Sequence, residues 1–186
     1  MRTATRLPAL ETPSLILREI LPRDSVAFCN FMMQDDYQRF IAMRLASARE
    51  VEMFVARAMS RQGDQRRSAF QLAAEEKLSG EAIGDGFLIR SDPRTFEIGW
   101  GLHPAMWRMG LGQEIGTALL ALAFERLGAD RAWCKIMRDN TASTKLAQRL
   151  GLHQTRTVAD YPASLGHVTS VDIFSIKAAE YFDRAY

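Results

Sequence analysis

The stretch that decides the fold runs from residue 95 to residue 116 and reads Thr-Phe-Glu-Ile-Gly-Trp-Gly-Leu-His-Pro-Ala-Met-Trp-Arg-Met-Gly-Leu-Gly-Gln-Glu-Ile-Gly. Over residues 95–102 apolar side chains alternate with glycine or glutamate, which predicts a β-strand. Glycine weakens a strand unless another group must approach its backbone closely. Residues 107–112 then form a glycine-bearing loop that opens a long helical pattern. Free amides at a helix start bind anions, so the stretch predicts a phosphate cradle beside an open strand.

A tight turn without a ligand is the alternative explanation for Gly110 and Gly112. Two established phosphate-binding motifs do not fit the loop. A P-loop requires Lys-Ser or Lys-Thr after its last glycine, and neither is present. A Rossmann fingerprint requires a third glycine one position earlier than Gly116.

The chain on either side of this stretch predicts one α/β domain over residues 1–186. Residues 1–13 predict a loosely held arm or a lead-in strand, and residues 34–44 a loop or broken helix. The first helix follows Pro22 with an expected buried side of Val26, Phe28, Phe31 and Met32, and the second follows a capping box at Ser47 and Glu50. Strands are expected at 14–20, 68–74, 82–89, 95–102, 131–137, 152–161 and 167–176. The remaining helices are expected at 110–127, from the Asn140 cap to Leu150, and, as a turn or helix, at 178–185.

Composition excludes several classes of protein. The 186 residues are 47% hydrophobic and 25% charged, with a net charge of +2, which argues against disorder and against nucleic acid or membrane as a partner. Two distant cysteines, Cys29 and Cys134, predict neither a disulfide framework nor a thiolate zinc site, and the three histidines form no metal motif. Without a signal-peptide or membrane-spanning pattern, we expect a cytoplasmic protein.

Several motifs together resemble the GNAT superfamily of acetyl-CoA-dependent N-acetyltransferases, and in detail its RimJ/RimL-like branch. The motifs are Glu97-Ile98-Gly99-Trp100, Trp107-x-x-Gly110-x-Gly112, Asn140-Thr141-Ala142-Ser143 and Leu150-Gly151-Leu152. The opening Thr12-Pro13-Ser14-Leu15-Ile16-Leu17-Arg18, with Asp24 after Pro22, also fits this branch, so the resemblance covers nearly the whole chain. It implies a GNAT-like fold, a mixed central sheet with splayed parallel strands flanked by helices.

The resemblance also implies how acetyl-CoA, the cosubstrate, would bind. Amides of the loop would hold the pyrophosphate, and the pantetheine arm would lie where strand 95–102 splays from strand 131–137. That position would account for the strand glycines, and the Leu102 amide would polarise the thioester carbonyl. Asn140 would bind the pantetheine while also capping a helix. The expected cofactor-binding residues are Leu102, Arg108, Met109, Gly110, Leu111, Gly112 and Asn140, and no metal is expected.

Acetyl transfer requires a neutral amine, so a base must take a proton from the acceptor. Glu97 is the candidate base, although a glutamate of ordinary pKa near 4.3 is a poor match to an amine unless burial or a water relay narrows the gap. A surface or salt-bridged carboxylate is the alternative interpretation. In many relatives a Tyr protonates the leaving thiolate, but this chain has Ala147 at that position. Ser143 is therefore the substitute candidate for the proton donor, and water is the other candidate.

The resulting hypothesis is an N-acetyltransferase that moves acetyl to a primary amine by direct attack in a ternary complex. The acceptor would be a protein N-terminus, a polyamine, an amino acid or an antibiotic. Residues expected near it are Asp35, Asp36, Tyr37 and Asp160. A catalytically weak acyl-CoA-binding sensor is the main alternative, a nucleotide-binding module is a third, and the protein would be a monomer or homodimer.

Overall fold

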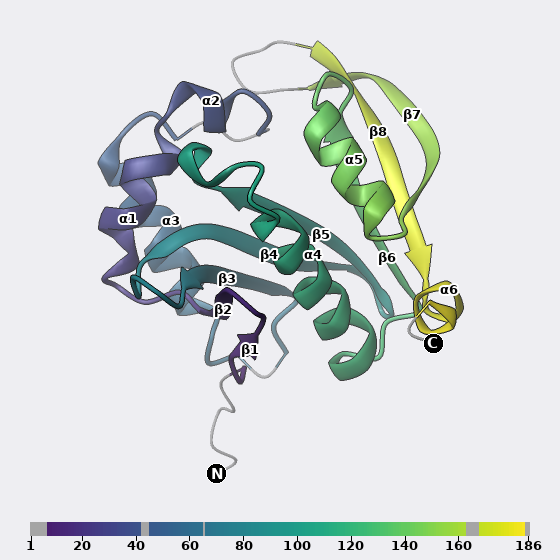
Figure 1. The fold of residues 1–186 in the computed structure, drawn as a ribbon, viewed down its shortest axis with the longest axis horizontal. Coiled ribbons are helices and arrows are strands. Elements are labelled where there is room, and N and C mark those ends of the chain that lie inside the picture. Colours follow the sequence, from purple (N-terminus) through teal and green to yellow (C-terminus); the bar gives the residue numbers. More distant parts are fainter. Residues whose placement is uncertain (1–6, 42–44, 65, 163–167, 185–186) are drawn as a thin grey trace.

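An eight-stranded mixed sheet with the order β1-β2-β3-β4-β5-β6-β8-β7 forms the centre of the computed structural model (Figure 1). The structure describes residues 7–41, 45–64, 66–162 and 168–184. All strand pairs are antiparallel except β5 with β6, which confirms the mixed α/β architecture. The strands are β1 (Leu10–Glu11), β2 (Leu15–Glu19), β3 (Ala69–Glu76), β4 (Ala82–Asp92), β5 (Thr95–Leu102), β6 (Arg131–Met137), β7 (His153–Pro162) and β8 (Val168–Lys177).

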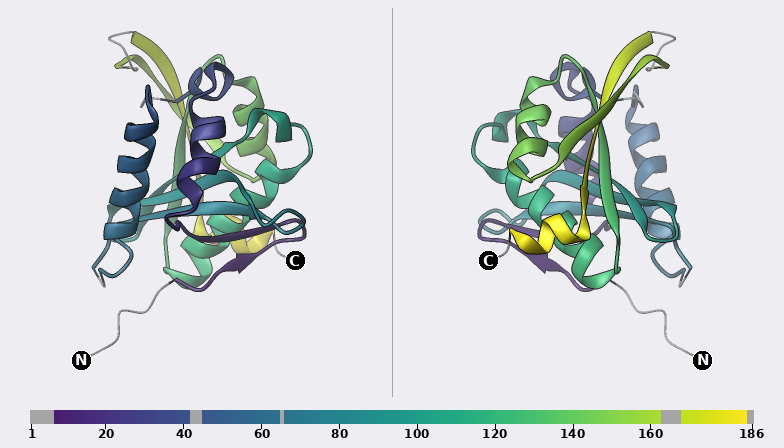
Figure 2. Two further views of the ribbon diagram at one scale, coloured as in Figure 1. Left: turned by 90° about the vertical axis from the view of Figure 1, so that its left-hand side faces the viewer. Right: turned by 90° about the vertical axis from the view of Figure 1, so that its right-hand side faces the viewer.

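Helices cover both faces of the sheet, with α3 on one face and α4 and α5 on the other (Figure 2). Each face has its own hydrophobic core. The first joins α1 and α3 to Ala73 and Ala82, and the second joins α4 and α5 to the opposite side of β2–β6. The helices are α1 (Asp24–Met32), α2 (Asp35–Gln38), α3 (Ala48–Ser60), the 3₁₀ turn η1 (Pro104–Met106), α4 (Leu111–Ala121), the π-helical turn η2 (Leu122–Arg126), α5 (Thr141–Arg149) and α6 (Ala178–Asp183).

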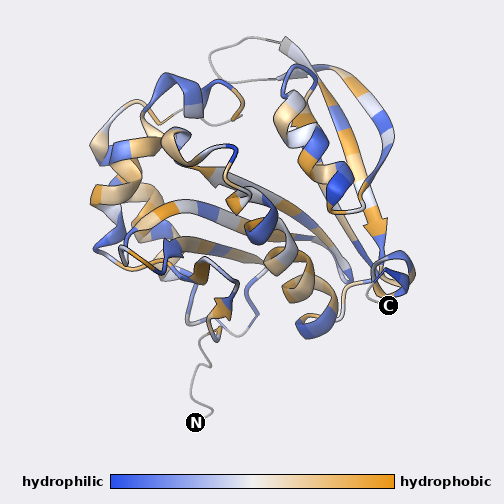
Figure 3. Ribbon diagram, in the orientation of Figure 1, coloured by the Kyte–Doolittle hydropathy of each residue, from blue (hydrophilic) through white to orange (hydrophobic). Residues whose placement is uncertain are grey.

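Helix α4 and η2 together fill the predicted helix of residues 110–127. Hydrophobic residues occupy the middle of this segment and hydrophilic residues its two ends (Figure 3). The turn widens to π geometry at Leu122–Arg126, which the sequence pattern did not predict. Gly128 then adopts a left-handed φ of +63° and ends the helix, as expected of a glycine at this position.

One sequence prediction about the N-terminal region is wrong, and one of two alternatives is confirmed. Val26 is 72% exposed, because it precedes Phe28 by two residues and therefore lies on the other side of α1 from Phe28, Phe31 and Met32. Of the two alternatives for residues 1–13, the lead-in strand is present at Leu10–Glu11, which pairs with β2, and the Thr12 hydroxyl donates to Glu114 Oε2 at 2.6 Å. The expected arm over residues 1–6 lies outside the described residues.

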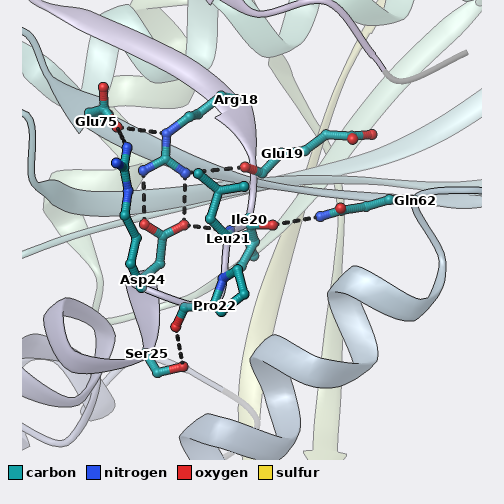
Figure 4. Close-up of polar contacts among 10 residues, drawn as sticks. Arg18, Glu19, Ile20, Leu21, Pro22, Asp24, Ser25, Gln62 and Glu75 are labelled. Atoms are coloured by element: carbon teal, nitrogen blue, oxygen red, sulfur yellow. Dashed lines mark hydrogen bonds and ion pairs between the residues drawn. The ribbon is translucent and has the colours of Figure 1, made fainter.

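A buried ion cluster fixes the path from β2 into α1 (Figure 4). Arg18 Nη1 and Nη2 donate to the two carboxylate oxygens of Asp24 at 2.7 and 2.8 Å, and its Nε donates to Glu75 at 2.6 Å. Asp24 is only 2% exposed, so removing Arg18 would leave a buried charge without its partner. The cluster therefore orients α1, whose Phe31 packs against the Tyr37 ring. Among the described residues, no helix combines the length and apolar character needed to cross a membrane.

Candidate active site

Strands β5 and β6 begin side by side and then part. Their parallel pairing covers Thr95 with Arg131, Phe96 with Ala132 and Glu97 with Trp133, and it stops there although β5 continues to Leu102. Among the residues that the structure describes, the second half of β5 therefore pairs on its β4 edge only. This confirms the predicted splay, and it leaves an open strand edge that an extended ligand can follow.

The backbone at the end of β5 faces this open edge. The N–H of His103 donates to the Ile83 carbonyl of β4 at 2.8 Å. Successive N–H groups of an extended strand point to opposite edges, so the N–H of Leu102 points away from β4 and toward the gap. The Leu102 carbonyl accepts a hydrogen bond from Trp107 Nε1 at 2.9 Å, which fixes the strand end to the loop that follows.

The loop before α4 has the geometry of an anion cradle. Arg108 and Gly110 have left-handed φ values of +66° and +83°, and Gly110 is the N-cap of the 11-residue α4. Within the described part of the chain, the backbone amides of residues 108–112 donate no hydrogen bond, whereas those of Gln113 and Glu114 bond back to Gly110. Several free amides and the positive end of a helix dipole therefore meet at one place.

Glycines also allow α4 and α5 to approach each other closely beside the gap. A Cβ on Gly116 would overlap the Leu150 side chain, and one on Gly112 would lie 3.2 Å from Leu146. At the start of α5, Asn140 Oδ1 accepts from the Ser143 amide at 3.1 Å, so the predicted helix cap is present. The proposed contact of Asn140 with pantetheine remains a prediction.

The two candidates for the acid step occupy different environments on α5. Ala147 is fully buried in the core beneath the helix, so this position offers no hydroxyl and no room for a tyrosine without repacking. Ser143 is half-buried in the first turn. Its role in protonating the thiolate remains a prediction.

Glu97 lies where β5 and β6 separate, and it is paired with a cation. Its Oε1 is 3.0 Å from Lys135 Nζ, and the Glu97 side chain is 14% exposed. Lys135 also lies over the Tyr161 ring at 5.5 Å, and its hydrogen bonds with Tyr161 and Glu97 outweigh burial and raise its pKa. Five residues separate Glu97 from Leu102, or about 17 Å of extended strand. Glu97 therefore cannot touch a carbonyl held at the Leu102 amide.

The reason for the strand glycines differs from the one expected. The Phe87 ring fills the space above Gly99, and the Tyr37 hydroxyl and the Asp85 carboxylate fill the space above Gly101. Side chains of the protein itself, rather than a ligand, therefore require both glycines. The predicted explanation through the pantetheine arm is wrong for this face of the strand.

Tyr37 and Asp85 form a polar pair at the Gly101 end of β5. The Tyr37 hydroxyl donates to Asp85 Oδ1 at 2.6 Å. Burial raises the pKa of Asp85 to about 6, although the Tyr37 hydrogen bond stabilises the carboxylate and opposes that rise. Burial, followed by the charge of Asp85, raises the pKa of Tyr37 well above its ordinary value.

Sequence reasoning named Tyr37 but missed Asp85. The available signal was a carboxylate between Gly84 and Gly86 in the otherwise apolar stretch of residues 82–89. Of the other residues expected near the acceptor, Asp35 and Asp36 are exposed at the start of α2. Asp160 is exposed in β7 with a φ of +53°.

Comparison with known proteins identifies the family. The model of the acetyltransferase (GNAT) domain matches residues 14–153. The chain belongs to the GNAT acetyltransferase family. It is therefore an acetyl-CoA-dependent N-acetyltransferase, and this replaces the nucleotide-binding alternative. The chain is also similar to the uncharacterized N-acetyltransferase YoaA of Bacillus subtilis, with 26% identity over 91% of this chain and 96% of YoaA.

Solved structures of GNAT enzymes share the fold. RimL, a ribosomal L7/L12 α-N-protein acetyltransferase in complex with coenzyme A, superposes with a TM-score of 0.80 at 18% identity over 91% of this chain and 98% of RimL. A spermidine N-acetyltransferase from Vibrio cholerae, in complex with coenzyme A and spermine, superposes with a TM-score of 0.78 at 16% identity over 92% of this chain and 99% of that enzyme.

Proposed function

We propose that this GNAT enzyme transfers the acetyl group of acetyl-CoA to a primary amine by direct attack in a ternary complex. The observation that carries the proposal is the parting of β5 and β6 next to the loop of residues 108–112, whose five amides donate no hydrogen bond to any residue that the structure describes. An open strand edge suits an extended, amide-containing arm, and a cluster of free amides at a helix start suits a diphosphate. Both lie at the end of the same strand, as one molecule of coenzyme A requires.

Each part of the candidate site has a separate task in this proposal. The amides of Arg108, Met109, Gly110, Leu111 and Gly112 would hold the diphosphate. The Leu102 amide would stabilise negative charge on the carbonyl oxygen, and removing one such donor typically costs about 10²–10³-fold in rate. Asn140 would bind the arm, and Ser143 would protonate the departing thiolate.

The acceptor side lies on the face of the sheet that carries Tyr37 and Asp85. The exposed carboxylates Asp35 and Asp36 stand nearby in sequence at the start of α2. Acidic groups favour a cationic acceptor by Coulomb attraction. We therefore place a protein N-terminus and a polyamine, the acceptors of the RimL and spermidine enzymes by their names, ahead of neutral or acidic amines.

A panel of amines tests the proposal. The purified chain is incubated with acetyl-CoA and a peptide with a free N-terminus, spermidine, an amino acid or an aminoglycoside, and the acetylated product is measured by mass alongside release of coenzyme A. The same peptide with a blocked N-terminus is the matched control and should give no product. Failure of acetyl-CoA to bind by calorimetry would overturn the proposal. Binding without turnover of any amine would instead favour the acyl-CoA sensor, to which the buried Ala147 lends support.

A further inference from the structure

Asp85 occupies a position that packing alone does not explain. It lies in the interior strand β4 and is flanked along the chain by Gly84 and Gly86. Its neighbours across the sheet are Ala73 of β3 and Gly101 of β5, neither of which carries a charge. Placing a carboxylate there costs desolvation energy, which an asparagine bonded to the same Tyr37 hydroxyl would largely avoid.

The surroundings of Asp85 hold one carboxylate oxygen and leave the other available. The Tyr37 hydroxyl donates to Oδ1, whereas within the described residues Oδ2 has no hydrogen-bond donor. Asp85 is half-buried rather than sealed. Tyr37 is itself fixed by edge-to-face contact with Phe31, whose ring lies 5.9 Å from His103, the other titratable side chain at this end of β5.

The register of the sheet places this pair beside the proposed reaction centre. Asp85 is opposite Gly101, and Gly101 immediately precedes Leu102, whose N–H faces the gap. Asp85 Oδ1 reaches across from β4 to lie over Gly101, where an added Cβ would overlap it. From there the Leu102 amide is one residue, or about 3.4 Å, further along β5, compared with about 17 Å from Glu97, so Asp85 is the nearer carboxylate to the thioester carbonyl position.

We propose that Asp85, held above Gly101 by the Tyr37 hydroxyl, is the general base that takes a proton from the acceptor amine. This inference rests on the proposed amine acetylation. The acceptor ammonium gives one proton to Asp85, and the nitrogen lone pair forms the new N–C bond to the carbonyl carbon as charge moves to the oxygen at the Leu102 amide. When the C–S bond breaks, the thiolate takes the second proton from the nitrogen, directly or through Ser143. Asp85 then returns its proton to water.

The ionisation of Asp85 fits this task. A base must be unprotonated at the working pH, yet as basic as that allows. Burial raises the pKa of Asp85 from 3.8 to about 6, so the group is mostly ionised at pH 7 and is a stronger base than an exposed aspartate. Tyr37, whose own pKa is raised, remains a neutral donor throughout this range.

Kinetics of the variant Asp85→Asn test the assignment, with Asp92→Asn as the matched control at the exposed far end of the same strand. With an amine that the wild type acetylates, we expect Asp85→Asn to lower kcat/KM by at least about 10²-fold, to leave the Kd for acetyl-CoA unchanged and to remove the acidic limb near pH 6. Tyr37→Phe should lower kcat/KM by less and move that limb to higher pH, because the carboxylate loses a donor. Asp92→Asn should behave as the wild type.

A second variant separates a base from a structural residue. In Asp85→Ala the space of the carboxylate is open, so added formate should restore part of the lost rate, with no such rescue in the wild type or Asp92→Asn. If Asp85→Asn kept the kcat/KM and the pH profile of the wild type, the assignment of Asp85 as the base would be overturned, while the proposed function would stand. Absence of turnover by the wild type with every amine would overturn the proposed function, and this assignment with it.

Discussion

Two carboxylates lie on the same face of the sheet along β5, in different surroundings. Glu97 is in the strand itself where β6 is still paired, and its partner is the cation Lys135. Asp85 stands opposite Gly101, four residues further along, and its partner is the neutral hydroxyl of Tyr37. A neighbouring cation forms an ion pair with a carboxylate and competes with a proton for it. A neutral hydroxyl beside a partly buried carboxylate carries no such charge, so burial can make the carboxylate more basic. This difference supports our proposal that the second carboxylate, and not the first, is the base.

Gly101→Ala should have the largest effect on the catalytic rate. The new methyl group would overlap the Tyr37 hydroxyl and Asp85 Oδ1, so we expect kcat/KM to fall about 10²-fold as the base is displaced. The acetyl-CoA affinity, measured by calorimetry, should change little. Gly99→Ala is the matched control, because the nearest atoms to its methyl group belong to the Phe87 ring; it should lower stability by about 1–3 kcal/mol and spare most of the catalytic rate. Equal losses of rate in the two variants would contradict the comparison.

Stability should respond to the two carboxylates with opposite signs. The pKa of Asp85 is raised from 3.8 to about 6, so between these values the native state binds more protons than the unfolded state, and stability falls as pH rises through this window. Asp85→Asn should therefore be more stable than the wild type at pH 8 by about 3 kcal/mol, and equal to it below pH 4. Glu97→Gln should instead lose about 1 kcal/mol at pH 8 with its ion pair. Urea unfolding at pH 4, 6 and 8 measures the stabilities of both variants. An Asp85→Asn variant less stable than the wild type at pH 8 would count against the raised pKa of Asp85.

The loop before α4 should affect binding without affecting the proton transfer. Gly110 has a φ of +83°, and alanine there costs about 1–2 kcal/mol, so Gly110→Ala should weaken acetyl-CoA binding by about 10-fold in calorimetry. The pH profile of kcat should not move. Gly80→Ala is the matched control, since Gly80 has a φ of +71° in the turn between β3 and β4 and also has open space around it. A Gly80→Ala variant that weakened binding as much would remove the loop from the cofactor site.

The smallest change in rate should come from Glu97→Gln. If Asp85 is the base, kcat/KM of this variant should stay within about threefold of the wild type between pH 6 and 9, because Glu97 is too far along the strand to touch the acceptor nitrogen. A pH–rate series on both proteins measures this. A loss of tenfold or more together with a missing acidic limb would restore Glu97 as the base and exclude Asp85.

The sequence predicted the parts of the fold that local patterns control. Strand β6 begins and ends at the predicted residues, and α5 begins after the Asn140 cap and ends before Gly151, which has a φ of +85°. The splay of β5 from β6 followed from the family resemblance and is present. The π-helical turn at Leu122–Arg126 was not predicted, because its residues fit a regular helix equally well.

The site was harder to predict than the fold. Tyr37 and Asp85 are 48 residues apart, and only the pairing of β4 with β5 and the packing of α2 bring them over Gly101. A glycine in a strand indicates that something lies close to it, but not what. At positions 99 and 101 the answer is a side chain of the same chain, which no spacing rule reveals.

Gly101 also carries an evolutionary consequence. A single methyl group at this position would overlap the Tyr37 hydroxyl and the Asp85 carboxylate together, so a change at 101 requires a change at position 37 or 85. In descendants of this chain, a larger residue at 101 should appear only where the tyrosine or the aspartate has already been replaced. Such lineages should draw their basic group from another strand, and they would record how an acetyltransferase relocates its proton acceptor while keeping its coenzyme site.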